Sequence, residues 1–575
     1  MLKDTNKKAY IRLIIVQFMM VGLICFIGAK SFDIQIFDGR KLSIMADNDH
    51  SRYVTINGER GNILDRNMNP LATSTEAFSI TANPSEIKDP AAIARKLSAI
   101  LGMNAGKLEK QLSSDRKFTL IARTVPPAQK DQIEQLNHPQ IFFEKDSKRL
   151  YPNRDLAAQV LGFTGLRNQG LEGLEYKYNE ILDGQSIRIK IKKDKKGGVL
   201  SLNQLTQLKG KSIVLTLDKK IQFFSEKTLE HTVRTYHAKS GMALVMQPET
   251  GEFLSIAHFP KFNPNNFSAY DQAIFRNRAV TDPFEPGSAM KVFTAAAALE
   301  NGFDPKAIFD CNNGTYKVGT FTIHDTHPHD WLSINQIIKF SSNIGAVKIA
   351  ETIGNKTLHQ YLTSFGFGEK TWIDSPGETA GSLLPYHKWS KIDASAISFG
   401  QGISVSAVQL ISAISTIANN GLMMKPMLIK KIISSSGEDE LVYRPEPVRQ
   451  VISPDTARKI KRMMNLVTHE DGTGTKAAMD GYPVCGKTGT AQKVRQDKKG
   501  YSNTRYTAVF AGFAPLKDPK LAILVIIDEP EKKYHGGEVA APAFKTIMEE
   551  SFSYLNIPPE TDKNMIALMS GGVKQ

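Results

Sequence analysis

The chain has 575 residues, too many for one ordinary hydrophobic core, so the sequence predicts two or three folded units. Apolar residues make up 41% and charged residues 23%, which is typical of globular proteins and excludes a collagenous or broadly disordered chain. The net charge of +15 suits nucleic acid, an anionic membrane surface or an anionic polymer. Nucleic acid is disfavoured because zinc-finger spacing and aromatic RNA-binding signatures are both missing. Only three cysteines occur, Cys25, Cys311 and Cys485, and they show no metal or redox spacing, so a disulfide framework is excluded as the main source of stability.

The N-terminal segment predicts a membrane anchor. Residues 13–29 carry no charge, and at ~1.5 Å per residue they would form a helix of roughly 25 Å, enough for one bilayer crossing. Residues 1–12 precede this run with the basic residues Lys3, Lys7, Lys8 and Arg12. Cationic flanks stay inside, so residues 1–12 are predicted to be a cytoplasmic tail of an inner-membrane protein whose remainder lies outside. A cleaved signal peptide is the alternative, but Ile27 stands where a small residue is required.

Outside the predicted anchor, we expect a first region at 30–205, a second region at 211–557 and a C-terminal tail at 558–575. The first region is mixed, with helical patterns at 90–101 and 127–136. The second region is more regular.

The second region predicts one sheet that is completed by distant segments. Residues 241–257 contain two apolar runs around a Pro-Glu-Thr-Gly turn, which is typical of a hairpin. Two further strands are predicted at 507–515 and 521–530, followed by a helix at 540–555. Strands at both ends with helices between them indicate an α+β domain, in which a mostly antiparallel sheet is flanked by helices.

The first of three short motifs pairs Ser288 with Lys291 at the start of an Ala-rich helix. Residues three apart share a helix face, with Cβ atoms ~5–6 Å apart. A serine becomes a useful nucleophile only when a base takes its proton, and a lysine can be that base only when its pKa falls by ~3 units. The pattern is common: Ser85 and Lys88 have the same spacing and are assigned to surface structure.

The second motif is Ser341-Ser342-Asn343, which is predicted to lie in a turn between two helical stretches. Ser341 and Asn343 can point the same way from such a turn, so that a hydroxyl could relay a proton and an amide could hold a carbonyl. Taken alone, the pattern is equally typical of a helix N-cap.

The third motif is Lys487-Thr488-Gly489-Thr490. A strand edge with a lysine and two threonine hydroxyls can bind a carboxylate, and Gly489 allows a backbone to approach closely. The stretch 481–488 also fits the phosphate-binding pattern G-x-x-x-x-G-K-T. That loop must open a helix, whereas the Thr- and Gly-rich residues after it predict a strand, so the ATPase interpretation is rejected.

The order of the three motifs is more specific than any one of them. S-x-x-K, then S-x-N about fifty residues later, then K-T-G after a longer gap, is the signature of β-lactamases and penicillin-binding proteins.

With these residues in view, the chain resembles class B penicillin-binding proteins, and the cell-division FtsI type most closely. Further segments carry the likeness in order: 60–67, 151–165, 170–182, 262–267, 377–385, 398–410 and 512–515. Met68 departs from the family pattern, which often has Gly there, and Ser406-Ala407 replaces the usual Thr-Pro. These departures make the local turn geometry uncertain at both positions, but they do not affect the residues of the three motifs.

The resemblance implies a serine D,D-transpeptidase of the penicillin-binding fold that cross-links cell-wall stem pentapeptides and is acylated by β-lactams. It implies that Ser288 attacks the penultimate D-Ala carbonyl, that Lys291 accepts its proton, and that Ser341 relays a proton under the influence of Lys487. Asn343 would orient the acyl chain.

The resemblance also implies that Thr488 and Thr490 hold the terminal carboxylate beside Gly489, and that the backbone N–H groups of Ser288 and Thr490 form the oxyanion hole. It requires no metal or organic cofactor. It implies a partner, a polytopic glycosyltransferase of the FtsW type, and Gln17 inside the apolar run is a weak physical indication of such pairing.

Several alternatives stay open on sequence alone. A β-lactamase or carboxypeptidase would use water in place of the acceptor amine, but such hydrolases usually lack a long membrane-proximal region. A penicillin-sensing receptor would need more than a dozen cytoplasmic residues, and a structural division component would not need catalysis. The cluster His324, Asp325, His327, His329 and Asp330 could hold a metal, although a polar surface loop explains it more simply.

Overall fold

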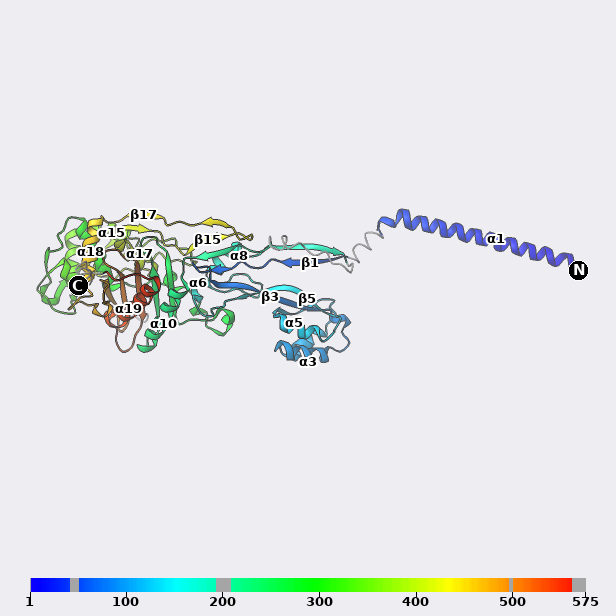
Figure 1. Cartoon of the computed structure of the whole chain (residues 1–575), viewed down its shortest axis with the longest axis horizontal. Coiled ribbons are helices and arrows are strands. Elements are labelled where there is room, and N and C mark those ends of the chain that lie inside the picture. The colour runs from blue at the N-terminus through cyan, green and yellow to red at the C-terminus, as the bar shows by residue number, and fades with distance from the viewer. Residues whose placement is uncertain (1, 42–50, 193–207, 496–499, 561–575) are drawn as a thin grey trace, which may run out of the picture. The chain divides into compact units, whose positions relative to one another are not determined.

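The computed structural model describes residues 2–41, 51–192, 208–495 and 500–560, and the chain divides into two compact units (Figure 1). The first unit comprises residues 1–58 and 185–208, and the second comprises 59–184 and 209–575. Within the first unit, strand β1 (Ser51–Asn57) pairs antiparallel with β6 (Ser186–Lys192), and Thr55 lies opposite Arg188.

The first unit begins with one long apolar helix, α1 (Leu2–Phe32), which continues into a π-helical segment at Asp33–Phe37. The stretch Ala9–Phe37 is long and apolar enough to cross a membrane. It contains the predicted anchor at 13–29. The helix also includes most of the predicted tail, because residues 2–12 hold neither proline nor glycine to stop it.

The second unit contains a seven-stranded sheet that combines segments from both predicted regions. Its order is β16-β15-β7-β2-β3-β4, with β5 paired to β3. The strands are β2 (Ile63–Leu64), β3 (Pro70–Ala82), β4 (Thr119–Val125), β5 (Ile141–Leu150), β7 (Ser212–Leu215), β15 (Ile429–Ile433) and β16 (Asp439–Val442). Strand β2 pairs parallel with β7, so main-chain hydrogen bonds join residues from before and after position 205.

Three helices cover the outer part of this sheet and form a small core with it: α3 (Pro90–Leu101), α4 (Ala105–Leu112) and α5 (Pro127–Glu134). The helices predicted at 90–101 and 127–136 are thereby confirmed. Helix α3 begins at the Asp89 cap, whose side chain accepts a hydrogen bond from the Ala92 N–H, and ends at Gly102 with φ +67°. Both ends follow ordinary capping chemistry.

A buried ionic cluster joins three segments that carry the family resemblance. Glu175 is fully buried and accepts hydrogen bonds from Arg60 Nε and Arg149 Nε, each at 2.6 Å. The Tyr151 hydroxyl donates to the same carboxylate at 3.2 Å. Buried charges are tolerated only when they are paired and hydrogen-bonded, so these residues depend on one another.

The other half of the second unit is built on a five-stranded antiparallel sheet in the order β18-β19-β20-β8-β9. The strands are β8 (Ser240–Met246), β9 (Phe253–Phe259), β18 (Cys485–Val494), β19 (Tyr501–Ala514) and β20 (Leu521–Asp528). The predicted hairpin and the two predicted late strands are therefore confirmed.

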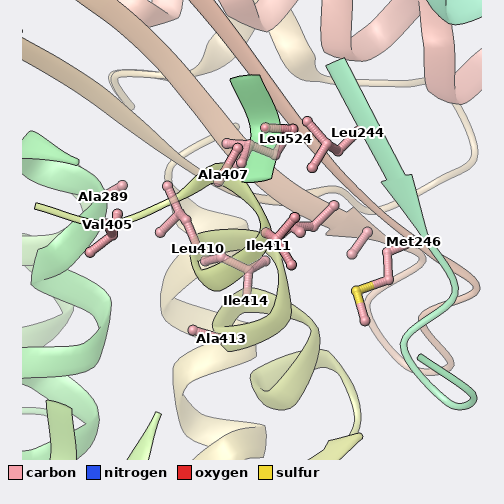
Figure 2. Packing of buried hydrophobic residues seen from close by; sticks show 14 of the residues in the cluster. Leu244, Met246, Ala289, Val405, Ala407, Leu410, Ile411, Ala413, Ile414 and Leu524 are labelled. Atoms are coloured by element: carbon pink, nitrogen blue, oxygen red, sulfur yellow. The ribbon is translucent and has the colours of Figure 1, made fainter. Parts of the chain in front are cut away.

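Helices cover both faces of this sheet. On one face, α17 (Ala407–Ala418) packs Leu410, Ile411 and Ile414 near Leu244 and Leu524 (Figure 2). On the other face lie α10 (Lys219–Thr235) and α19 (Gly536–Leu555). Because strand side chains alternate between faces, a strand covered on both sides is apolar throughout, as the run from 521 to 527 is.

The remaining elements lie between β9 and β18 or in the connecting segments. The helices are α6 (Ala158–Leu161), α7 (Gly173–Lys177), α8 (Asn179–Leu182), α11 (Arg278–Thr281), α12 (Lys291–Glu300), α13 (Ile334–Phe340), α14 (Asn343–Ile353), α15 (Asn355–Ser364), α16 (Lys391–Ser398) and α18 (Pro454–Leu466). The short strands are β10 (Ile308–Asp310), β11 (Thr315–Val318), β12 (Phe321–His324), β13 (Trp331–Ser333), β14 (Leu422–Met424) and β17 (Pro447–Gln450).

The two departures from the family pattern are accommodated locally. Met68 adopts φ +67°, the conformation that glycine takes most easily, and its N–H donates to the Asp65 carbonyl at 3.0 Å. Ser406 caps α17 in a capping box with Gln409, whose N–H donates to the serine hydroxyl at 3.1 Å. The helix start is thus kept without the usual Thr-Pro.

Candidate active site

Ser288 lies in a tight 3-10 turn, Gly287–Met290, that leads directly into α12. The sequence placed it in the first turn of the helix; the structure places it one turn earlier. Gly287 adopts φ +55°, and its N–H donates to the Gly400 carbonyl at 3.1 Å, which holds the turn against a distant loop. Ser288 is half-buried, whereas its neighbours Ala289 and Met290 are fully buried.

Ser341 occupies the turn between α13 and α14, as the sequence predicted. Its backbone is left-handed, with φ +61° and ψ +40°. Non-glycine residues rarely adopt this conformation, and it is concentrated at functional sites. The N-cap of α14 is Ser342, whose side chain accepts from the Gly345 N–H. Ser341 and Asn343 flank this cap, so their side chains are available for other contacts.

Asp325 holds this turn in place. Its carboxylate accepts from the Asn343 N–H at 2.5 Å and the Ile344 N–H at 3.1 Å, and the Ser342 hydroxyl donates to it at 2.5 Å. The carboxylate therefore stabilises the N-terminus of α14. The sequence offered Asp325 only as a member of a His-rich loop, and among the described residues no group of three or more His, Cys, Asp and Glu could hold a metal.

Two buried lysines meet at the Ser341 hydroxyl. Lys487 Nζ donates to Ser341 Oγ at 2.8 Å, and Lys291 Nζ lies 3.3 Å from the same oxygen. Lys291 also donates to the Ser341 carbonyl at 2.5 Å and to Asn343 Oδ1 at 2.7 Å. The structure therefore brings together four predicted residues that are spread over almost two hundred positions. Within the described residues, the Ser288 hydroxyl makes no hydrogen bond.

Burial controls the charge of this pair. It lowers the pKa of Lys291 to about 7, against the smaller opposing effect of the Asp325 carboxylate. Burial, followed by the charge of Lys291, holds the pKa of Lys487 well below its usual range. Two ammonium groups that share one hydroxyl repel each other, so the pair resists carrying both charges. An uncharged amine is thus available beside a hydroxyl that a second lysine orients.

Strand β18 approaches the Ser288 turn at Gly489. A Cβ atom at this position would lie 2.8 Å from the Pro286 carbonyl oxygen and 3.1 Å from Val509 Cβ. A side chain at this position would therefore clash with the protein's own chain. This reason for a glycine is separate from the close approach of a substrate backbone that the sequence suggested. Residues 485–494 form a continuous strand, so the segment after Lys487 is not the helix that a phosphate-binding loop requires.

The two threonines of this strand have different partners. Thr488 Oγ1 lies 2.9 Å from Thr473 Oγ1, and either hydroxyl can be the donor. Thr490 Oγ1 accepts from the Gly536 N–H at 3.1 Å, which leaves its own proton free to donate. Thr473 and Gly536 were missed by sequence reasoning, because single Thr and Gly residues carry no spacing signal.

Comparison with known proteins agrees with this fold. Residues 241–549 match the family model of the penicillin-binding protein transpeptidase domain, and residues 55–215 match the penicillin-binding protein dimerisation domain. A structure of a peptidoglycan synthetase from Bifidobacterium adolescentis superposes with a TM-score of 0.71 at 27% identity, covering 89% of this chain and 98% of that one. Penicillin binding protein 3 from Mycobacterium tuberculosis, complexed with aztreonam, gives a TM-score of 0.70 at 27% identity over 88% and 98%.

Relatives of similar length are found in distant bacteria. The chain is 31% identical to the peptidoglycan D,D-transpeptidase FtsI of Escherichia coli, over 96% of this chain and 92% of that one. It is 33% identical to the stage V sporulation protein D of Bacillus subtilis, over 95% and 86%. The chain therefore belongs to the penicillin-binding transpeptidase family. Within that family it is a class B penicillin-binding protein, a peptidoglycan D,D-transpeptidase with an N-terminal dimerisation-type domain.

Proposed function

We propose that this transpeptidase works through a serine acyl-enzyme formed on Ser288. The Ser288 oxygen attacks the carbonyl of the penultimate D-Ala of a stem pentapeptide while Lys291, uncharged, accepts its proton. The C–N bond to the last D-Ala breaks, and Ser341 passes a proton to the leaving amine. Lys487 orients the Ser341 hydroxyl, and Asn343 orients the acyl chain. An amine from a neighbouring stem then attacks the ester, releases Ser288 and completes the cross-link.

The same proposal assigns substrate binding to β18. Thr490 has a hydroxyl proton free for the terminal carboxylate, with Thr488 beside it. The backbone N–H groups of Ser288 and Thr490 form the oxyanion hole, and the close packing at Gly489 keeps the two segments in register. One such donor contributes about 3–4 kcal/mol to transition-state stabilisation in other enzymes.

The single observation that carries the proposal is that the two buried lysines meet at the Ser341 hydroxyl. One of them, Lys291, lies one turn after the half-buried Ser288. A lysine with a pKa near 7 is matched to general-base catalysis at neutral pH. A β-lactam presents a strained amide to the same nucleophile, and its ring opens to leave a covalent adduct.

Labelled penicillin tests the proposal. Intact-mass spectrometry should show one adduct per chain, and peptide mapping should place it on Ser288. Ser288→Ala should abolish the adduct without lowering the Tm. Ser85→Ala is the matched control, because Ser85 has the same S-x-x-K spacing but lies exposed in a 3-10 turn at Pro84–Glu86. An adduct on another residue would refute the assignment, and rapid turnover of the adduct would indicate a hydrolase instead.

We also propose that the enzyme acts at the division septum, with its N-terminus in the cytoplasm, residues 30–205 as pedestal and residues 211–557 as the catalytic region outside. Its partner would be a glycosyltransferase of the FtsW type, bound in part through α1. Gln17 supports this pairing, because its polar side chain lies inside an apolar helix that could span a membrane. Gln17→Leu should weaken co-purification with that partner and leave penicillin labelling unchanged. A Ser288→Ala variant that still supports septation would indicate a structural division component whose catalysis is secondary.

A further inference from the structure

A pocket of about 350 Å³ opens on helix α15, and none of the residues of the Ser288 site line it. Its residues come from three segments that are distant in sequence: α15, the 3-10 turn Tyr386–Lys388 and strand β17. The lining residues are Lys356, His359, Gln360, Thr363, Ser364, Tyr386 and Arg449. The four α15 residues at 356, 359, 360 and 363 follow helical spacing, so they form one stripe along the helix.

The lining of the pocket holds two cations and no acidic residue, and one of the cations pairs with a carboxylate outside the lining. Lys356 and Arg449 carry positive charge, and no lining residue is acidic. Burial, and then the neighbouring His387, lower the pKa of His359, which favours its neutral ring. Lys356 is exposed and has no hydrogen-bond or ion-pair partner among the described residues. Arg449 Nε donates to the Ser364 carbonyl at 2.9 Å, and its Nη2 lies 3.6 Å from the carboxylate of Glu369. The guanidinium is therefore held at the rim with hydrogen-bonding capacity to spare.

An aromatic wall stands beside these cations. The His359 ring lies 5.8 Å from the ring of Tyr386 and 5.6 Å from that of Trp389. Trp389 is buried and fixed by its indole N–H, which donates to the Leu384 carbonyl at 2.7 Å. Tyr386 remains 38% exposed, so part of its ring can receive a ligand.

The pocket also offers polar groups that could form hydrogen bonds with a sugar. The hydroxyl of Thr363 and the amide of Gln360 can donate and accept hydrogen bonds along the same helix stripe. An aromatic face, hydroxyl and amide partners, a Lys356 that is unpaired within the described part of the chain, and the spare donors of Arg449 suit a polar ring that carries an anionic group. The volume lies in the range of small-molecule sites.

We propose that this pocket binds a saccharide bearing an oxyanion, either a carboxylate or a phosphate. Lys356 and Arg449 neutralise the anion, Tyr386 packs against the sugar ring, and Gln360 and Thr363 bond its hydroxyls. The proposal does not depend on acylation at Ser288. Binding here would let the enzyme hold a carbohydrate chain while a peptide reacts elsewhere on the same unit.

The test uses the full chain in detergent and measures binding of three sugars by isothermal titration calorimetry and saturation-transfer NMR. N-Acetylmuramic acid supplies a carboxylate, N-acetylglucosamine 1-phosphate supplies a phosphate, and N-acetylglucosamine is neutral. We expect at least one anionic sugar to bind about tenfold or more tightly than the neutral one, because charge-assisted contacts to two cations are at stake. Inorganic pyrophosphate should compete with the bound sugar in the parent protein.

Variants then assign the binding to the pocket. Lys356→Ala/Arg449→Ala should weaken the anionic sugar about tenfold or more, because both charge-assisted contacts are lost. The control Lys391→Ala/Arg444→Ala removes the same charge from exposed positions outside the pocket, so its Kd should stay within about twofold. Penicillin labelling should be unchanged in both.

The two anionic sugars distinguish the source of the ligand. Preference for the carboxylate indicates a cell-wall glycan, and preference for the phosphate indicates a phosphate-linked precursor. The proposal is overturned if neither anionic sugar binds, if the neutral sugar binds equally well, or if the pocket variant binds as tightly as the parent or loses no more than the control.

Discussion

The pH dependence of acylation follows from the low pKa of Lys291. With a pKa of about 7 the amine is half neutral at pH 7, whereas a lysine at the usual 10.5 would be neutral in only about one molecule in 3,000. This difference corresponds to roughly 5 kcal/mol between the two protonation states, and it arises mainly from burial. If the neutral amine is the base, the acylation rate should rise about tenfold per pH unit below 7 and level off above it.

Asp325→Asn tests the cause of this profile. The Asp325 carboxylate raises the pKa of Lys291, so removing its charge should move the inflection to lower pH by on the order of one unit. Asparagine retains an oxygen for the Asn343 and Ile344 N–H groups, so the turn should survive. Asp330→Asn is the matched control, because Asp330 is exposed in the same loop and loses the same charge.

The assay is the second-order rate constant for labelling by a fluorescent penicillin between pH 5 and pH 9, measured for the parent and both variants. Thermal unfolding at each pH confirms that the proteins remain folded. The reasoning fails if the parent profile is flat, or if Asp325→Asn moves the inflection to higher pH. It also fails if the control shifts the inflection as far as Asp325→Asn does.

Three further predictions concern stability and local geometry. Glu175→Gln leaves Arg60 and Arg149 without their shared buried carboxylate, so urea denaturation should show a loss of about 3–5 kcal/mol in the free energy of unfolding. Burial raises the pKa of Glu226 to about 7, so the folded state binds more protons than the unfolded state between pH 4.5 and 7. Stability should therefore fall as pH rises through this window, and Glu226→Gln should flatten that slope in a series of urea melts. Gly489→Ala should reduce penicillin labelling at least about tenfold, since its Cβ would meet a backbone carbonyl at 2.8 Å; labelling at the parental rate would show that the strand can move aside.

Local patterns predicted several of the helices and strands well. Helix α3 followed from the helical pattern at 90–101, which depends only on near neighbours in the chain. The apolar run from 521 to 527 predicted a strand because period and length need no distant partner. The position of Ser288 was predicted less accurately, because nearly the same residues favour a 3-10 turn and the first turn of an α-helix.

The sequence could not predict that strands from the two predicted regions, 30–205 and 211–557, form one sheet. Strand β2 pairs with β7 across about 150 positions, and no local property of either two- or four-residue stretch predicts that partner. The sequence analysis named Asp325 only as part of a His-rich loop. Its hydrogen bonds to the N-terminus of α14 form only because that loop folds back onto the start of the helix.

The sequence by itself determined the long apolar helix near the N-terminus, the order of the three motifs and the apolar runs of the central strands, because each depends on residues that are near neighbours in the chain. Only the tertiary structure decided that Lys291 and Lys487 meet on Ser341, and that both lose their ordinary basicity. The physical reason is that desolvation belongs to the surroundings of a side chain, and those surroundings are assembled from segments that only folding brings together.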